Sequence, residues 1–148
     1  MSINSLTEHP VVNCVLLADR HHGLNEAVRG LLESAFEAVV MVADEASLFE
    51  SAKRLQPTLA VVEISLVHDD GFRWLQRLRK SCPDLKLILL SVHDEPSVCR
   101  AAMEAGAHGF VLKRHLATEL LPAIDAVLAG KSYFSSRPSE PEPPRSAG

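Results

Sequence analysis

Four charged residues lie at the ends of apolar runs, where folding could bring them together. Asp19 and Arg20 follow one run, Glu63 lies near the end of a second, and Lys113 follows a third. The two carboxylates offer oxygen atoms, the ligands that Mg²⁺ prefers. An arginine can instead bridge two carboxylates through forked hydrogen bonds, and these four charges sum to zero without a metal. If folding brings them together, these residues form an internally neutral charge network.

Elements of two kinds must position these residues. The apolar runs are nearly continuous in Val, Leu and Ile, which is typical of strands covered by helices on both faces. The strand candidates are residues 11–18, 38–42, 59–64, 85–91 and 109–112. Helical spacing recurs between them, although Pro122 falls inside the last helical pattern. The order predicts an α/β fold, (βα)₅, in which right-handed crossovers place helices on both faces of a doubly wound, parallel five-stranded sheet.

Capping residues and a proline indicate where two of the expected helices begin. Ser47 followed by Glu50 has the spacing of a capping box, and Asp44 is a competing cap for the same helix. Asp94, with Pro96 two residues later, is typical of the start of the fourth helix.

Composition bounds the class of protein. With 148 residues, 47% hydrophobic and 23% charged, the chain fits one globular domain. The net charge of −4 lacks the basic excess of a nucleic-acid-binding domain. No signal peptide and no membrane-spanning run is present in the sequence, so we expect a cytoplasmic protein without membrane contact. Cys14, Cys82 and Cys99 are expected to be buried small hydrophobes.

Two terminal stretches are expected to lie outside the folded unit. Residues 1–10 are polar and aperiodic, and residues 135–148 hold four of the nine prolines. We therefore predict a flexible N-terminus, a domain over residues 11–134 and a disordered tail or linker over 135–148. The tail contains two PxxP spacings, which could be SH3-type ligands but which a proline-rich linker also produces by chance.

Ligands of such sheets collect at the carboxyl ends of the strands, beside the topological switch point. Asp19, Glu63, Ser91 and Lys113 are all predicted at that edge. Several histidines and acids are predicted there too, namely His21, His22, His68, His93, Asp69, Asp70 and Asp94. No pair of them has a diagnostic ligand spacing, so we predict no metal site; a pH-sensing role for the histidines stays open.

Residues 11–134 resemble the receiver domain of bacterial response regulators, and in particular the subfamily that usually carries a C-terminal helix-turn-helix. The stretches that carry the resemblance are VLLADRH (15–21), LAVVEISLVHDDG (59–71), LILLSVHDE (87–95) and AAMEAGAHGFVLKRH (101–115). The resemblance implies a flavodoxin-like receiver fold with strand order 2-1-3-4-5. It also implies phosphoryl transfer from a histidine kinase to an aspartate after the third strand, with Mg²⁺ held by an acidic pair.

The sequence departs from the family at two of those positions. Asp19 matches the first residue of the acidic pair, but Arg20 occupies the second. Glu63 occupies the phosphoacceptor position. Ser91 matches the hydroxyl residue after the fourth strand and Phe110 the switch aromatic. Lys113 matches the lysine that follows the fifth strand in the family. Arg20 removes an oxygen ligand of the family's metal site and puts a positive charge there, so we expect Mg²⁺ binding to be weak or absent and no cofactor. The resemblance therefore implies an atypical receiver, or pseudo-receiver, with no catalytic residue and no working phosphorylation site.

We interpret the chain as a non-enzymatic receiver in two-component signalling that acts through protein contacts. The resemblance implies an output face made by helix four, strand five and helix five, over roughly residues 94–106, 109–113 and 117–131. Its expected surface residues are Arg100, Met103, Glu104, His108 and Arg114. A partner protein or a second copy would dock there; a histidine kinase is a further candidate partner, and we expect this domain itself to bind no nucleic acid. A locked state that mimics phosphorylation requires Glu63 to engage Ser91 and Lys113.

Three alternatives stay open. The chain could be a conventional phosphorylatable receiver if Glu63 and Arg20 are tolerated. It could be the N-terminal receiver of a DNA-binding transcriptional regulator whose helix-turn-helix lies beyond residue 148. An enzyme of the same fold class, such as a flavodoxin-like protein, would need a phosphate-cradling loop after the first strand, and the segment 19–23 has only one glycine.

Overall fold

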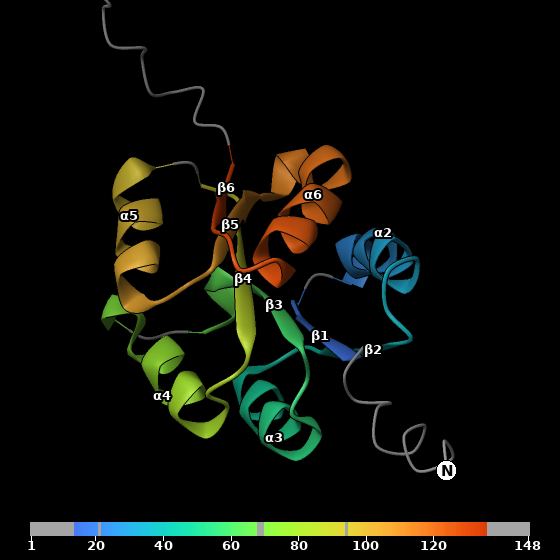
Figure 1. Cartoon of the computed structure of the whole chain (residues 1–148), viewed down its shortest axis with the longest axis horizontal. Helices are drawn as coiled ribbons and strands as arrows, with labels where there is room; N and C mark the ends of the chain where they lie inside the picture. The colour runs from blue at the N-terminus through green and yellow to red at the C-terminus, as the bar shows by residue number, and fades with distance from the viewer. Residues whose placement is uncertain (1–13, 21, 68–69, 94, 136–148) are drawn as a thin grey trace, which may run out of the picture.

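Six parallel strands form one sheet in the part of the chain that the computed structural model describes, which is residues 14–20, 22–67, 70–93 and 95–135. The strands are β1 Cys14–Ala18, β2 Ala38–Val42, β3 Leu59–Glu63, β4 Lys86–Ser91, β5 Gly109–Leu112 and β6 Tyr133–Phe134. They lie in the order β2-β1-β3-β4-β5-β6 (Figure 1). The predicted parallel α/β sheet with the order 2-1-3-4-5 is confirmed, and β6 extends it at the β5 edge.

Helices cover both faces of this sheet in the described part of the chain, as Figure 1 shows. Their bounds are α2 His22–Glu33, α3 Glu45–Leu55, α4 Arg73–Ser81, α5 Pro96–Ala105 and α6 Leu116–Leu128. Helices α3, α4 and α5 pack against one face and α2 and α6 against the other, so the protein has one buried core on each side of the sheet. Successive residues of a strand point to opposite faces, so Leu16 joins the first core and Leu17 the second.

Of the two N-cap candidates for α3, Asp44 and Ser47, the structure shows Asp44 in that position. Asp44 is the N-cap, because its carboxylate accepts a hydrogen bond of 2.7 Å from the backbone N–H of Ser47. The backbone and side-chain hydrogen bonds from Ser47 lower the pKa of the Asp44 carboxyl. Pro96 is the first residue of α5, with Glu95 at its cap, and Asp94 lies outside the described residues. Pro122 lies inside α6 on its exposed side, and the helix continues past it to Leu128.

The folded unit reaches one residue farther than the sequence predicted. Ser135 is buried, and its backbone N–H donates to the Phe110 carbonyl at 2.8 Å, although we had placed it in the tail. A two-residue strand is too short for a periodic pattern, which is why β6 was missed. Residues 1–10 and 136–148 lie outside the described residues. In the part of the chain that is described, no helix is both long enough and apolar enough to cross a bilayer.

The half-buried His108 side chain links β4, β5 and helix α4. Its Nδ1 accepts the backbone N–H of Leu87 at 3.0 Å, and the Arg79 Nη1 lies 3.3 Å from its Nε2. Burial lowers the pKa of His108, and the positive charges of Arg79 and Lys86 lower it further. The fold therefore favours the neutral imidazole, since a proton on Nδ1 would break the bond to Leu87.

We predict that His108 makes the free energy of unfolding fall as the pH drops below about 6.5. In that range the unfolded chain binds a proton that the folded chain excludes, so stability present at higher pH is lost on acidification. In His108→Asn the amide oxygen can still accept from Leu87 without titrating. Urea titrations across this pH range should show a shallower pH dependence in the variant, and equal slopes would contradict the assignment.

Gly109 begins β5 where no side chain fits. A Cβ atom there would lie 2.9 Å from Ile88 Cγ1 and 3.3 Å from Val127 Cγ2. We predict that Gly109→Ala lowers the free energy of unfolding by about 1–3 kcal/mol because it overpacks the core. Gly30→Ala is the matched control, since Gly30 lies in exposed helix with nothing within 4 Å of its Cβ position. The control should be neutral or stabilising by up to about 1 kcal/mol in the same urea titrations.

Candidate functional site

The sheet register brings the predicted charged residues to one edge. Ala18 pairs with Val62, so Asp19 and Glu63 follow neighbouring positions where β1 and β3 end. Ser91 ends β4 beside Leu112, the last residue of β5, and Lys113 comes directly after it. All four of these side chains are buried, Asp19 and Glu63 almost completely. Burying a charge is costly unless it is paired, so the contacts of each of these side chains are described in turn.

Lys113 supplies the positive charge beside Asp19. Its Nζ lies 2.8 Å from Asp19 Oδ2, and the side-chain exposures are 6% and 0%. Lys113 opens a one-turn 3₁₀ helix, Lys113–His115, so that its side chain reaches across the carboxyl edge of the sheet instead of pointing into either core. The two groups therefore form a close ion pair that is shielded from water.

The carboxylate of Glu63 is held locally. The hydroxyl of Ser65, two residues along the chain in the 3₁₀ helix Ile64–Leu66, donates to Glu63 Oε1. Lys113 lies against Asp19 and the Ser91 hydroxyl donates to the His93 carbonyl, and the engagement of Glu63 with Ser91 and Lys113 stays a prediction. Ser65 was not singled out from the sequence, although a hydroxyl two residues after a buried acid is a signal for such a local bond.

Ser91 and Phe110 occupy the two switch positions. The Ser91 hydroxyl donates to the His93 carbonyl at 2.9 Å and accepts the His93 N–H at 3.0 Å, so it closes the end of β4. Phe110 is 2% exposed and packs in the core beneath helices α4 and α5. The structure thus gives Ser91 a role at the strand end and Phe110 a role in packing.

Arg20 lies apart from the buried charges. Its side chain is exposed, whereas that of Asp19 is fully buried, and a bridge from its guanidinium to the carboxylates of Asp19 and Glu63 stays a prediction. The difference follows from chain direction: Asp19 turns inward at the end of β1, and the next residue turns outward. The cation of the buried pair is therefore Lys113, and Arg20 contributes its charge from the surface.

The histidines do not assemble a metal site among the residues that are described. His93 is exposed, His21 and His68 lie outside the described residues, and the same holds for the side chain of His22. Within that part of the chain, no group of three or more His, Cys, Asp and Glu side chains is placed to hold a metal ion.

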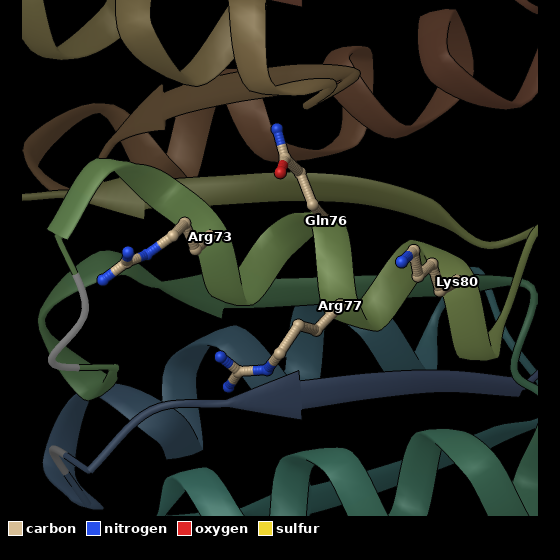
Figure 2. Close-up of a pocket in the computed structure, with 4 residues that line it drawn as sticks. All are labelled: Arg73, Gln76, Arg77 and Lys80. Atoms are coloured by element: carbon tan, nitrogen blue, oxygen red, sulfur yellow. The ribbon is translucent and has the colours of Figure 1, made fainter.

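A separate hollow of about 310 Å³ lies on the outer side of α4. Figure 2 shows the residues that line it, Arg73, Gln76, Arg77 and Lys80. Arg77 is fixed there by Glu45 at 3.4 Å and by the Phe49 ring, whose centroid lies 5.0 Å from its guanidinium carbon. None of the buried charged residues at the sheet edge lines this hollow, so the two features are distinct.

Comparison with known proteins assigns the family. The model of the response regulator receiver domain matches residues 15–125. This chain belongs to that family. Response regulator UvrY of Escherichia coli is 32% identical over 126 residues, which cover 82% of this chain and 57% of that protein. The transcriptional regulatory protein MctR of Rhizobium johnstonii is 29% identical over 135 residues, covering 88% and 62%.

Solved receiver structures have the same fold. A two-component response regulator of the LuxR family from Aurantimonas sp. superposes with a TM-score of 0.75 at 25% identity, over 86% of this chain and 91% of that one. The non-phosphorylated receiver domain of RcsB from Escherichia coli gives 0.73 at 24% identity, over 84% and 99%. The receiver spans only about three fifths of the length of UvrY and MctR.

Receivers as a family are expected to hold Mg²⁺ at this edge, and the donors present here do not fit it. One carboxylate, Asp19, is already paired with Lys113, and a second, Glu63, accepts from Ser65. The position that should supply a further acid holds Arg20, whose side chain carries no oxygen. Mg²⁺ demands near-octahedral oxygen coordination, and these three described side chains lack the second acid of the family's metal-binding pair.

We predict that Lys113→Met lowers the free energy of unfolding by about 3–5 kcal/mol, because it leaves the Asp19 carboxylate buried without its partner. The double variant Asp19→Asn, Lys113→Met should recover part of this loss in a double-mutant cycle measured by urea denaturation. Arg29→Met is the control: it breaks the exposed Arg29–Glu33 pair of 3.0 Å and should cost less than about 0.5 kcal/mol. A cost near the control value for Lys113→Met would refute the buried pair.

Proposed function

We propose that this receiver is a cytoplasmic, non-enzymatic interaction module of two-component signalling that works without phosphorylation. The observation that carries the proposal is the buried Lys113–Asp19 pair of 2.8 Å. A phosphorylatable pocket needs its lysine for the phosphoryl oxygens and its acids for a divalent cation. Here the lysine and one acid are paired with each other, so a phosphoryl group or a cation would have to compete with that pair.

The second support is the residue in the phosphoacceptor position. Glu63 is one methylene longer than aspartate, and its Oε1 accepts from the Ser65 hydroxyl. A carboxylate oxygen displaced by about 1 Å from in-line geometry costs on the order of 10²-fold in rate. The local bond to Ser65 further holds that oxygen away from an incoming phosphoryl group.

The output of such a receiver must pass through a surface that does not depend on the pocket being charged. The candidate face consists of α5, the β5 edge and α6, with the exposed side chains of Arg100, Met103, Glu104 and Arg114. Met103 is 44% exposed, which is uncommon for a large apolar side chain and suits a protein contact. We infer that a partner protein or a second copy docks there; a histidine kinase would act as a binding partner and not as a phosphoryl donor.

A second candidate function is that of the N-terminal receiver of a DNA-binding transcriptional regulator. It is supported by the relatives, since UvrY and MctR extend well beyond the part that this chain matches, and MctR is a transcriptional regulatory protein. DNA binding would then belong to a separate helix-turn-helix. Reading the gene beyond the codon for Gly148 tests it, and a stop codon there would exclude it.

We predict that phosphorylation appears only when both altered positions are restored. The protein and the double variant Glu63→Asp, Arg20→Asp are each incubated with Mg²⁺ and acetyl phosphate, and mass spectrometry measures the added phosphoryl group. The variant regains an aspartate nucleophile and an acidic pair, so labelling is expected there, at residue 63, and not in the unaltered protein. The control variant Glu50→Asp, Arg54→Asp makes the same replacements on the exposed surface of α3 and should stay unlabelled. Labelling of the unaltered protein at Glu63 would overturn the proposed function.

A further inference from the structure

The outer edge of β5 is occupied by the chain's own C-terminal segment. Figure 1 shows β6 beside β5 at the end of the sheet, between α5 and α6. The Tyr133 N–H donates to the His108 carbonyl at 3.1 Å, and the Ser135 N–H donates to the Phe110 carbonyl at 2.8 Å. A partner that approaches the α5–β5–α6 face therefore meets β6 and not an open strand edge.

Ser135 fixes this segment through its side chain as well. Its hydroxyl accepts the backbone N–H of Leu112 at 3.0 Å and donates to Glu119 Oε1 at 2.5 Å. The residue is 4% exposed, so these bonds form away from water and leave few free polar atoms. One small side chain thus joins the exit of the chain to both β5 and α6.

Glu119 is the common acceptor on α6. It accepts from the Ser135 hydroxyl, and it also acts on Tyr133: burial raises the pKa of Tyr133, and the charge and hydrogen bonding of Glu119 raise it further. His115 Nδ1 lies 3.7 Å from the other Glu119 oxygen. The first turn of α6 therefore holds β6 from one side while the β5 backbone holds it from the other.

The contacts of Ser135 lie next to the buried pair of Lys113 and Asp19. Leu112, whose N–H is bound by Ser135, immediately precedes Lys113, and Lys113 carries the ammonium that pairs with Asp19. Phe110, whose carbonyl accepts from Ser135, is the switch aromatic of the family motif. A shift of this end of β5 would change both the pocket and the exit of the chain.

We propose that Ser135 holds the chain's own segment Lys131–Ser135 against the edge of β5. This role of Ser135 is called the latch below. Ser135 is a positioning residue: it fixes the point and direction at which the chain leaves the receiver and ties that exit to the position of Lys113. Only the use of this chain exit as an output route rests on the proposed function. The role of Ser135 as the latch does not depend on whether the protein is phosphorylated.

Hydrogen exchange of the full chain tests the latch. In Ser135→Ala the Leu112 N–H and the Glu119 carboxylate lose their partner, so exchange at Leu112 and at residue 135 should accelerate by at least about tenfold. Ser132→Ala is the matched control, since Ser132 is an exposed serine of the same segment, and it should change these rates by less than about twofold. Exchange at Leu16, in the centre of the sheet, reports global unfolding and serves as the reference.

Glu119→Ala provides a second route to the same result. It should release β6 and accelerate exchange at residue 135 as Ser135→Ala does, with Leu112 less affected because its bond to Ser135 persists. If Ser135→Ala and Ser132→Ala exchange alike at Leu112, the latch is overturned. If Lys113→Met leaves exchange at residue 135, relative to Leu16, unchanged within about twofold, the tie between pocket and exit is overturned while the proposed function still stands.

Discussion

A buried lysine–aspartate pair determines the chemistry of this receiver. Desolvating two charges is costly, and only a close, well-oriented partner offsets that cost. The sheet order supplies the partner, since parallel strands β1, β3, β4 and β5 all end at one edge and place Asp19 and Lys113 together there. Once paired, these groups offer little to a divalent cation or a phosphoryl group. The proposed loss of phosphorylation rests on this pairing together with Arg20 and Glu63 at the two altered positions.

The sequence predicted the elements well because the physical signals were strong. Continuous apolar runs predicted the positions of five of the six described strands, and the ends of those strands bring Asp19 and Lys113 together. Side-chain geometry could not be predicted in the same way. Arg20 follows a residue that turns inward and is exposed. Ser65 and Ser135 act through single hydroxyl bonds that no periodicity reveals. β6 has only two residues.

The pocket and the exit of the chain share one strand. β5 carries Phe110 and Leu112, to which Ser135 is bound, and it leads directly into Lys113. In a receiver that is not switched by phosphorylation, such an arrangement presents one fixed output geometry. A partner that pulls on β6, or one that displaces Lys113 from Asp19, would still alter that geometry. Under the proposed function, regulation by binding takes the place of regulation by a covalent group.

The most direct test of the central claim is a Mg²⁺ titration followed by NMR at the amides of Asp19, Glu63 and Lys113, together with the ammonium of Lys113. A pocket already filled by the ion pair should show only small, non-saturating shifts that Ca²⁺ and added NaCl reproduce. Saturable shifts at these three residues, with the Lys113 ammonium moving away from its paired position, would contradict the account, because the metal would then have displaced the lysine.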